Sequence, residues 1–221
     1  YNYSNLGLNF AGAILEKVSG VRFDRYVKDS VITPLGLHAG HNIDELDMSK
    51  CAAIYRYRDG QYVESDAYGS VAHRLDDYIM GYSAPIFSPT GGVKISAHDL
   101  ATYMMMHMNY GQLNGVRIIS EESAKTMQTP VWIKLTDDYY EDQYGLCLME
   151  FVDFLDDPHY NTPGNYPVGH TGDAYGLRSI MIWSPADGWG IVAITNGYVF
   201  NPEKDVVETL ANAIYKAYFG Q

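Results

Sequence analysis

The chain has 221 residues, of which 15 are Lys or Arg and 27 are Asp or Glu, so its formal net charge is −12 with histidines neutral. Hydrophobic residues make up 47% and charged residues 19%, a composition that supports a sizeable core and excludes a disordered chain. The acidic balance excludes a nucleic-acid partner, which requires clustered Lys and Arg, and no run of about 18 or more apolar residues predicts a transmembrane segment.

Helical periodicity marks the beginning of the chain. Apolar side chains recur at four-residue intervals from Leu6 to Val18, with Asn5 as the expected N-cap and Gly20 in the position of a C-terminal glycine. A second, shorter helix is predicted over residues 23–31, and the proline and glycine that follow end it.

Residues 37–89 predict a long connecting region rich in Gly, Asp, Tyr and Ser. Within it we predict only a short strand at residues 52–57 and a turn at Asp59-Gly60. His38 and His41 lack the spacing of a helical zinc site and a third ligand, so we expect solvent-exposed loop histidines and predict no metal site.

Regular structure returns at Ser96. Ser96-x-x-Asp99 resembles a capping box ahead of apolar residues at helical spacing. Residues 120–128 predict a further helix, with Glu121 and Glu122 favourably placed at its positive N-terminal end.

Strand-like runs dominate the last third of the chain, at residues 143–152, 177–183 and 189–196. A Pro-Ala-Asp-Gly turn between the last two favours an antiparallel hairpin. A C-terminal helix follows, with Asn201 as the expected cap and Pro202 in its first turn. The sequence therefore predicts an α+β fold in two regions: helices and loops over residues 1–142, and antiparallel strands with a packing helix over residues 143–221.

Two short clusters offer chemistry. Tyr3-Ser4-Asn5 stands where the first helix begins, and His170-Thr171-Gly172 stands just before the predicted hairpin. Each cluster is ordinary when taken alone, because Tyr-x-Asn is typical of a helix cap and His-Thr-Gly of a turn. Their order along the chain and the residues around them make the two clusters together a more specific indication of function than either alone.

With their neighbours, these clusters resemble the serine β-lactamase and penicillin-binding-protein family, particularly its class C and esterase branch. In that branch Tyr-Ser-Asn opens a helix that ends in Val-Ser-Gly, as at residues 3–5 and 18–20 here. Residues 38–82 match poorly. The other matches are Pro34-Leu35-Gly36-Leu37, Gly91-Gly92-Val93, Gly169-His170-Thr171-Gly172 and Thr195-Asn196-Gly197. The resemblance implies a β-lactamase/transpeptidase-like fold, incomplete here because the chain holds only the C-terminal portion.

The resemblance implies catalytic roles for Tyr3, Asn5 and His170. Family members attack a carbonyl carbon with the serine of a Ser-x-x-Lys motif, while the lysine and a tyrosine move protons. Tyr3 corresponds to that tyrosine, and Asn5 to the residue that positions the lysine and the substrate amide. A lysine commonly occupies the place of His170, and because histidine is mostly neutral at pH 7 we expect it to give Tyr3 weaker electrostatic help.

Substrate-binding roles are implied for the three residues that follow. Thr171 and Gly172 would belong to the strand edge that faces the substrate, with Thr171 binding a carboxylate or another polar group. The backbone N–H of Asp173 would be one of two oxyanion-hole donors.

The Ser-x-x-Lys motif itself does not occur in this sequence. No lysine has a serine three positions before it, and there is no Gly-x-Ser-x-Gly elbow. Since the family's serine precedes Tyr-x-Asn, we expect the nucleophile in a segment before Tyr1 and expect this chain alone to be inactive.

The implied function is hydrolysis of an amide or ester through an acyl-enzyme, without a cofactor. A β-lactam, a D-alanyl peptide and a simple ester are all compatible substrates. The 20 tyrosines support an alternative, a non-catalytic pseudoenzyme module that binds peptidoglycan or another saccharide on aromatic platforms. The upstream sequence distinguishes the two hypotheses, since a Ser-x-x-Lys there favours the hydrolase.

Further expectations concern the chain as a piece. The family's sheet uses both chain ends, so this piece would leave an unpaired edge and an uncovered apolar face, and we expect self-association. Family members are often exported, which favours a periplasmic or secreted location. Cys51 and Cys147 fit no CxxC pattern and are expected to be buried or half-buried free thiols.

Overall fold

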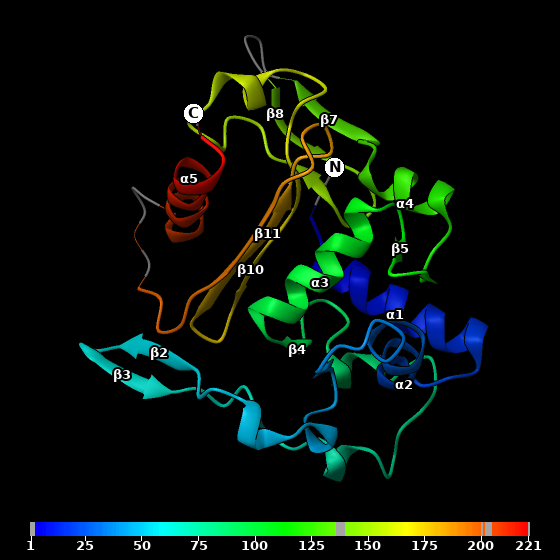
Figure 1. The fold of residues 1–221 in the computed structure, drawn as a ribbon. Helices are drawn as coiled ribbons and strands as arrows, with labels where there is room; N and C mark the ends of the chain where they lie inside the picture. The colour runs from blue at the N-terminus through cyan, green and yellow to red at the C-terminus, as the bar shows by residue number, and fades with distance from the viewer. Residues whose placement is uncertain (1–2, 136–139, 200, 202–204, 221) are drawn as a thin grey trace.

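A computed structural model describes residues 3–135, 140–199, 201 and 205–220 (Figure 1). Its α-helices are α1 (Asn5–Ser19), α2 (Phe23–Val27), α3 (Ala97–Met108), α4 (Glu121–Gln128) and α5 (Val206–Tyr218). Its strands are β1 (Ala39–Gly40), β2 (Tyr55–Arg58), β3 (Gln61–Glu64), β4 (Lys94–Ile95), β5 (Gln112–Leu113), β6 (Val116–Arg117), β7 (Trp132–Leu135), β8 (Tyr140–Tyr144), β9 (Met149–Glu150), β10 (Val168–Ala174), β11 (Leu177–Trp183) and β12 (Gly190–Ile194).

The main sheet is antiparallel and has six strands in the order β12-β11-β10-β9-β8-β7. The predicted hairpin is present, because β11 pairs with β12 from Ser179↔Ile194 to Trp183↔Gly190. The run predicted as one strand over residues 143–152 is instead divided between β8 and β9, since the chain turns at Cys147, whose φ is +62°. The division after residue 142 falls inside β8, which pairs with both β7 and β9.

Helices cover both faces of this sheet, with α3 on one side of β10 and β11 and α5 on the other (Figure 1). Successive side chains of a strand point to opposite faces of the sheet, so the apolar side chains of β11 contribute to a core on each face. Ile180 and Ile182 pack with α5 in one core cluster, while Met181 and Trp183 pack with α3 in the other. The α+β architecture predicted from the sequence is therefore confirmed.

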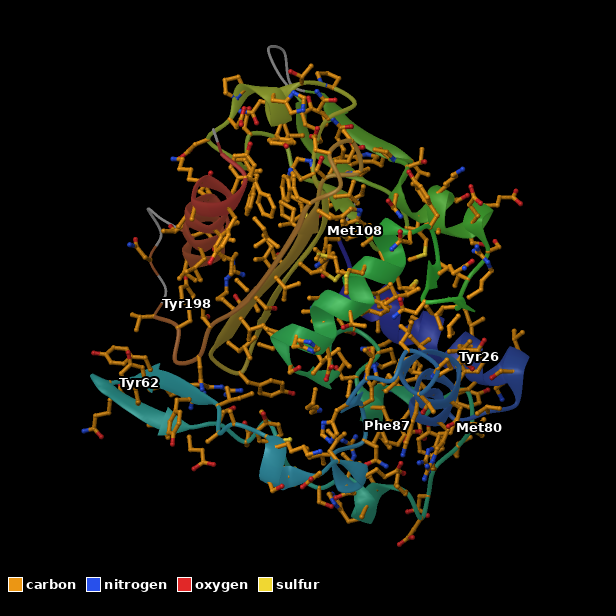
Figure 2. All side chains as sticks on the ribbon, in the orientation of Figure 1. Tyr26, Tyr62, Met80, Phe87, Met108 and Tyr198 are labelled. Carbon is orange, nitrogen blue, oxygen red and sulfur yellow. The ribbon has the colours of Figure 1, made fainter. Side chains whose placement is uncertain are left out.

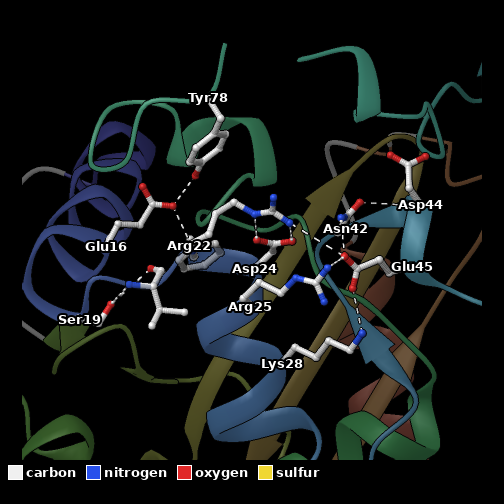
Figure 3. Close-up of polar contacts among 12 residues, drawn as sticks. Glu16, Ser19, Arg22, Asp24, Arg25, Lys28, Asn42, Asp44, Glu45 and Tyr78 are labelled. Carbon is white, nitrogen blue, oxygen red and sulfur yellow. Dashed lines mark hydrogen bonds and ion pairs between the residues drawn. The ribbon is translucent and has the colours of Figure 1, made fainter. Parts of the chain in front are cut away.

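A smaller core joins α1 and α2 to the segment before β4. Phe87 is buried there and lies among the side chains of these helices (Figure 2). Figure 3 shows polar contacts beside this smaller core. Arg22 pairs with Asp24, and the carboxylate of Glu45 accepts a hydrogen bond from Lys28 at 2.9 Å. The carboxylate of Glu16, fully buried, accepts hydrogen bonds from the hydroxyl of Tyr78 and from two backbone amides.

The connecting region of residues 37–89 contains only short elements, but the single strand predicted over residues 52–57 is β2 at Tyr55–Arg58, and the sequence did not predict its partner β3. The turn Asp59-Gly60 is present and closes the β2–β3 hairpin, with φ of +49° and +82°. This hairpin projects from the body of the molecule (Figure 1). Asn196 anchors it, since its Oδ1 accepts from the amide of Tyr55 at 2.9 Å and its Nδ2 donates to the carbonyl of Ala53 at 2.7 Å.

The structure corrects two expected helix caps. Ser4, not Asn5, caps α1, because its side chain accepts from the amide of Gly7 and Asn5 is already helical. Asp205, not Asn201, caps α5, because its Oδ1 accepts from the amide of Val207 at 2.8 Å. Pro202 lies outside the described residues.

The structure also corrects two expectations about single side chains. His41 is not a solvent-exposed loop histidine; it is half-buried, its Nδ1 lies 2.9 Å from the carbonyl oxygen of Phe87, and desolvation lowers its pKa to about 4. Cys147 is exposed because it stands on the turn between β8 and β9, whereas Cys51 is half-buried.

Candidate active site

The N-terminus of α1 and the middle of β10 meet at one place. The rings of Tyr3 and His170 lie side by side there, with centroids 6.1 Å apart and planes tilted by 37°. The side chain of Ser4 fixes the start of the helix and thereby places Tyr3 just outside its first turn. The two clusters found in the sequence, 167 positions apart at Tyr3 and His170, are thus neighbours in space.

His170 is held by its own strand. Its Nδ1 lies 2.6 Å from the carbonyl oxygen of Thr171, and a carbonyl oxygen only accepts, so Nδ1 carries the hydrogen. In the neutral ring the other nitrogen, Nε2, then carries a lone pair. The side chain can therefore accept a proton at Nε2, and its ring is the one that lies 6.1 Å from the ring of Tyr3.

Thr171, Gly172 and Asp173 lie on an open strand edge. They face Ile180, Ser179 and Arg178 across the β10–β11 ladder. On its other side β10 pairs with β9 only at Val168 and Gly169, so among the described strands the edge beyond Gly169 has no partner. Such an edge offers backbone N–H and C=O groups to an extended ligand.

Close packing constrains the same strand. A Cβ at Gly172 would stand 2.5 Å from Oγ of Ser179, so a larger residue would have to displace that side chain. The carboxylate of Asp173 is turned to Arg178, whose Nη1 is 3.5 Å from Oδ2. The strand then reverses through Tyr175 and Gly176, both at positive φ, in a two-residue hairpin turn.

Thr90 belongs to the site although sequence reasoning did not single it out. Its hydroxyl lies 3.1 Å from the backbone oxygen of Asn5 and 2.9 Å from Oδ1 of Asn9. It thereby ties the first turn of α1 to the Gly91-Gly92 turn. The Gly-Gly motif was visible in the sequence, but it gave no sign that the preceding threonine reaches α1.

A cavity of about 440 Å³ lies at the end of β10 that carries Ala174, next to the β10–β11 turn. Its lining comes from the Gly91–Ala97 segment, from residues between Leu46 and Tyr68, from the β10–β11 turn and from the end of β12. Its volume falls in the range typical of small-molecule sites, about 300–1,000 Å³. Its wall includes Gly91, which directly follows Thr90, and Ala174, the last residue of the strand that carries Thr171.

Lys94 contributes an ammonium group to the cavity wall. Burial lowers its pKa, and its Nζ donates to the carbonyl oxygen of Gly92 at 2.8 Å. Burial raises the pKa of Tyr68, another lining residue, whose hydroxyl donates to the carbonyl of Ala52 at 3.0 Å. Among the described residues there is no cluster of three His, Cys, Asp or Glu side chains that could hold a metal ion.

The fold and the meeting of α1 with β10 define the class of the protein as β-lactamase/transpeptidase-like. The β-lactamase family model matches residues 1–216, and the chain belongs to this family. Penicillin-binding protein 4 of Amycolatopsis lactamdurans is 25% identical over 206 residues, which are 90% of this chain and 48% of that protein.

Solved structures show the same fold. An octameric penicillin-binding-protein homologue from Pyrococcus abyssi superposes with a TM-score of 0.70 and 24% identity over 100% of this chain and 43% of that one. A class C β-lactamase gives a TM-score of 0.65 and 19% identity over 99% of this chain and 58% of that one. The chain therefore spans about half the length of these relatives. In the described part of the chain, no helix is both long and apolar enough to cross a membrane.

Proposed function

We propose that this chain supplies the proton-transfer and substrate-strand half of a serine hydrolase that cleaves an amide or ester through an acyl-enzyme. The observation that carries the proposal is the juxtaposition of Tyr3 and His170 at the open edge of β10. An edge without a strand partner suits an extended peptide-like substrate, and a phenol beside it suits proton transfer.

The steps follow from this arrangement. A serine hydroxyl outside these 221 residues attacks the substrate carbonyl carbon and passes its proton to the phenol oxygen of Tyr3, whose own proton moves to Nε2 of His170. The backbone N–H of Asp173 stabilises the oxyanion, and Asn5 positions the amide. The leaving amine or alcohol takes the proton, and water then attacks the ester carbonyl, releasing the acid and restoring the serine.

Thr171 and Gly172 bind the substrate along the edge of β10 in this proposal. A threonine hydroxyl can donate to a substrate carboxylate, and a glycine lets the substrate backbone approach closely. A β-lactam, a D-alanyl peptide and a simple ester each present a carbonyl and a polar group of this kind.

The test uses the full-length protein with its upstream sequence, assayed with nitrocefin and p-nitrophenyl acetate. We expect serine-dependent turnover, and Tyr3→Phe lowers kcat/KM by about 100-fold or more because it removes the proton-transfer group. Tyr218→Phe, at a tyrosine that is 79% exposed, serves as the matched control and leaves the rate unchanged. Serine-dependent turnover by the 221-residue chain alone would overturn the claim that it lacks the nucleophile.

The second candidate function is a saccharide-binding module without catalysis. It is favoured by the exposed aromatic rings of the β2–β3 hairpin, where Tyr57 and Tyr62 stand with ring centroids 5.1 Å apart. Tyr62 lies on this arm near Tyr198 (Figure 2). Absence of a Ser-x-x-Lys from the upstream sequence, together with peptidoglycan binding, would favour this module over the hydrolase.

We also propose that the chain alone self-associates. Strand β12 stands at the end of the strand order, and Leu6, Phe10, Ile14 and Val18 of α1 are 60–83% exposed. An open strand edge and an exposed apolar stripe both favour contact with a second copy. The octameric homologue is an assembly of related chains.

A further inference from the structure

We propose that the cavity beside β10 binds a carboxylate-bearing acyl group of the substrate, with Lys94 as the counter-ion. The inference rests on the proposed hydrolase function and names the substrate class for the same site. It follows from the charge of the cavity wall, the hydrogen bonds that Lys94 leaves unused and the distance to Thr171.

The wall of the cavity is basic although the chain is acidic. Among the described residues that line it, His38, Lys50 and Lys94 are basic and none is Asp or Glu, whereas the whole chain has 27 acidic and 15 basic residues. Most of the remaining lining is apolar, including Leu46, Ile54 and Val93. The cavity therefore suits a ligand with an apolar body and a negative charge.

Of the two lysines that line the cavity, Lys94 has no ion pair among the described residues. Lys50 has Asp47 at 3.9 Å, in an exposed pair. The ammonium of Lys94, by contrast, donates to the carbonyl oxygen of Gly92, and no carboxylate in the described part of the chain lies within ion-pair distance of it. An ammonium has three N–H donors, so donors remain for a ligand. Partial desolvation strengthens an ion pair with an incoming carboxylate.

The length of ligand that the site can take follows from the distance along β10 between Thr171 and the cavity wall. Ala174, on the cavity wall, stands three residues beyond Thr171 on β10, and a strand advances about 3.4 Å per residue, so the two are about 10 Å apart. A substrate bound along the edge of β10 at Thr171 would thus place the end of a long acyl chain near the cavity. Suberamic acid, an eight-carbon chain with an amide at one end and a carboxylate at the other, fits this span.

The experiment measures occupancy of the cavity without turnover. Cys51 lines the cavity, and Cys147 lies on the exposed turn between β8 and β9. Alkylation of each thiol by iodoacetamide is followed by mass spectrometry while the chain is titrated with suberamic acid, neutral octanamide or cationic 8-aminooctanamide. Cys147 is the internal control for reagent and ligand effects.

We expect suberamic acid to protect Cys51 at about tenfold lower concentration than octanamide, with 8-aminooctanamide weakest and Cys147 unprotected throughout. Lys94→Gln removes the preference for suberamic acid but keeps protection by octanamide, which also shows that the variant is folded. Lys94→Arg retains the preference. Lys125→Gln, the same charge change at an exposed lysine paired with Glu121, retains it as well.

Equal protection by suberamic acid and octanamide, no protection by either, or a preference that survives in Lys94→Gln would each overturn the inference. Because no turnover is needed, the outcome is separable from the proposed function. Hydrolysis by the full-length protein without carboxylate preference refutes only the role of Lys94. Carboxylate preference without hydrolysis refutes only the hydrolase.

Discussion

At the scale of single residues, Glu16 shows how one buried carboxylate organises a loop-rich region. It is 1% exposed, and it accepts from the amide of Phe23 at 2.8 Å and from the amide of Gly81 at 2.7 Å, besides the hydroxyl of Tyr78. A buried charge is tolerated only with such partners. Burial, together with the bond to Glu16, raises the pKa of Tyr78 and keeps its hydroxyl protonated as a donor.

Glu16→Ala would leave these three donors without an acceptor in a buried place. We expect the free energy of unfolding to fall by about 3 kcal/mol, measured by urea denaturation. Glu121→Ala is the control, because Glu121 is an exposed residue of α4 paired only with Lys125, and it lowers the urea midpoint much less than Glu16→Ala does. An equal loss in the two variants would contradict the role assigned to Glu16.

The raised pKa of Glu150 makes the free energy of unfolding depend on pH. Burial raises its pKa to about 7 from the usual value of 4.5 for a glutamate side chain. The folded state therefore binds the proton more tightly than the unfolded state, so this contribution is complete below about pH 4.5 and is lost as the pH rises through about 7. We expect a loss of about 1 kcal/mol between pH 5 and 8, after allowing for solvent screening at this half-buried position.

Glu150→Gln removes the titrating group, so thermal unfolding of this variant should lose less stability between pH 5 and 8 than the unaltered chain. The difference between the two chains isolates Glu150 from the other groups that titrate in this range. Parallel profiles for both chains would refute the assignment.

At the scale of elements, the sequence predicted best where the pattern was local. The run predicted over residues 177–183 is strand β11. Its consecutive apolar side chains point to opposite faces of the sheet, and both faces are covered by helices. Ser96 caps α3, as its capping-box pattern indicated, whereas Ser120, predicted as part of the next helix, is the N-cap of α4. The stripe from Leu6 to Val18 predicted α1, but periodicity alone does not say which face lies inward, and here Gly12, Ala13 and Glu16 are buried instead.

The candidate site was predictable only in part. Tyr3 and His170 were identified through a family resemblance, and their residues and spacing alone would not have paired them. Lys94 was not identified, because its cavity is formed by segments that are distant along the chain and its environment depends on tertiary packing. The cap of α5 was placed at Asn201 because Asn-Pro is a common helix start, whereas Asp205 also meets Arg178 across the fold.

The cap of α5 gives a prediction for this element. Asp205→Ala removes the acceptor for the amide of Val207 and the ion pair with Arg178, and should lower the free energy of unfolding by about 1–2 kcal/mol. Asp205→Asn keeps a capping oxygen and should lose less. Asn201→Ala, at the position indicated by the sequence, should have the smallest effect. A larger loss at Asn201 than at Asp205 in guanidinium unfolding would favour the cap expected from the sequence.

At the scale of the whole molecule, the apolar stripe of α1 and the edge strand β12 are the surfaces that favour association. Phe10 and Ile14 are 61% and 60% exposed, so replacing both with serine removes apolar area without creating a cavity. We expect the double variant to shift the chain towards a monomer in multi-angle light scattering, with an unchanged thermal midpoint. A clean monomer for the unaltered chain at high concentration would contradict self-association.

Glu16, whose carboxylate accepts three hydrogen bonds, also couples the local opening of two segments that are far apart in the sequence. The amides of Phe23 and Gly81 donate to the same carboxylate group, one to each oxygen. Neither amide gains access to solvent deuterium unless its bond to this side chain opens, and displacement of the carboxylate opens both at once. The two amides should therefore exchange at similar, slow rates, as one cooperative unit that fastens the long connecting region to the first two helices.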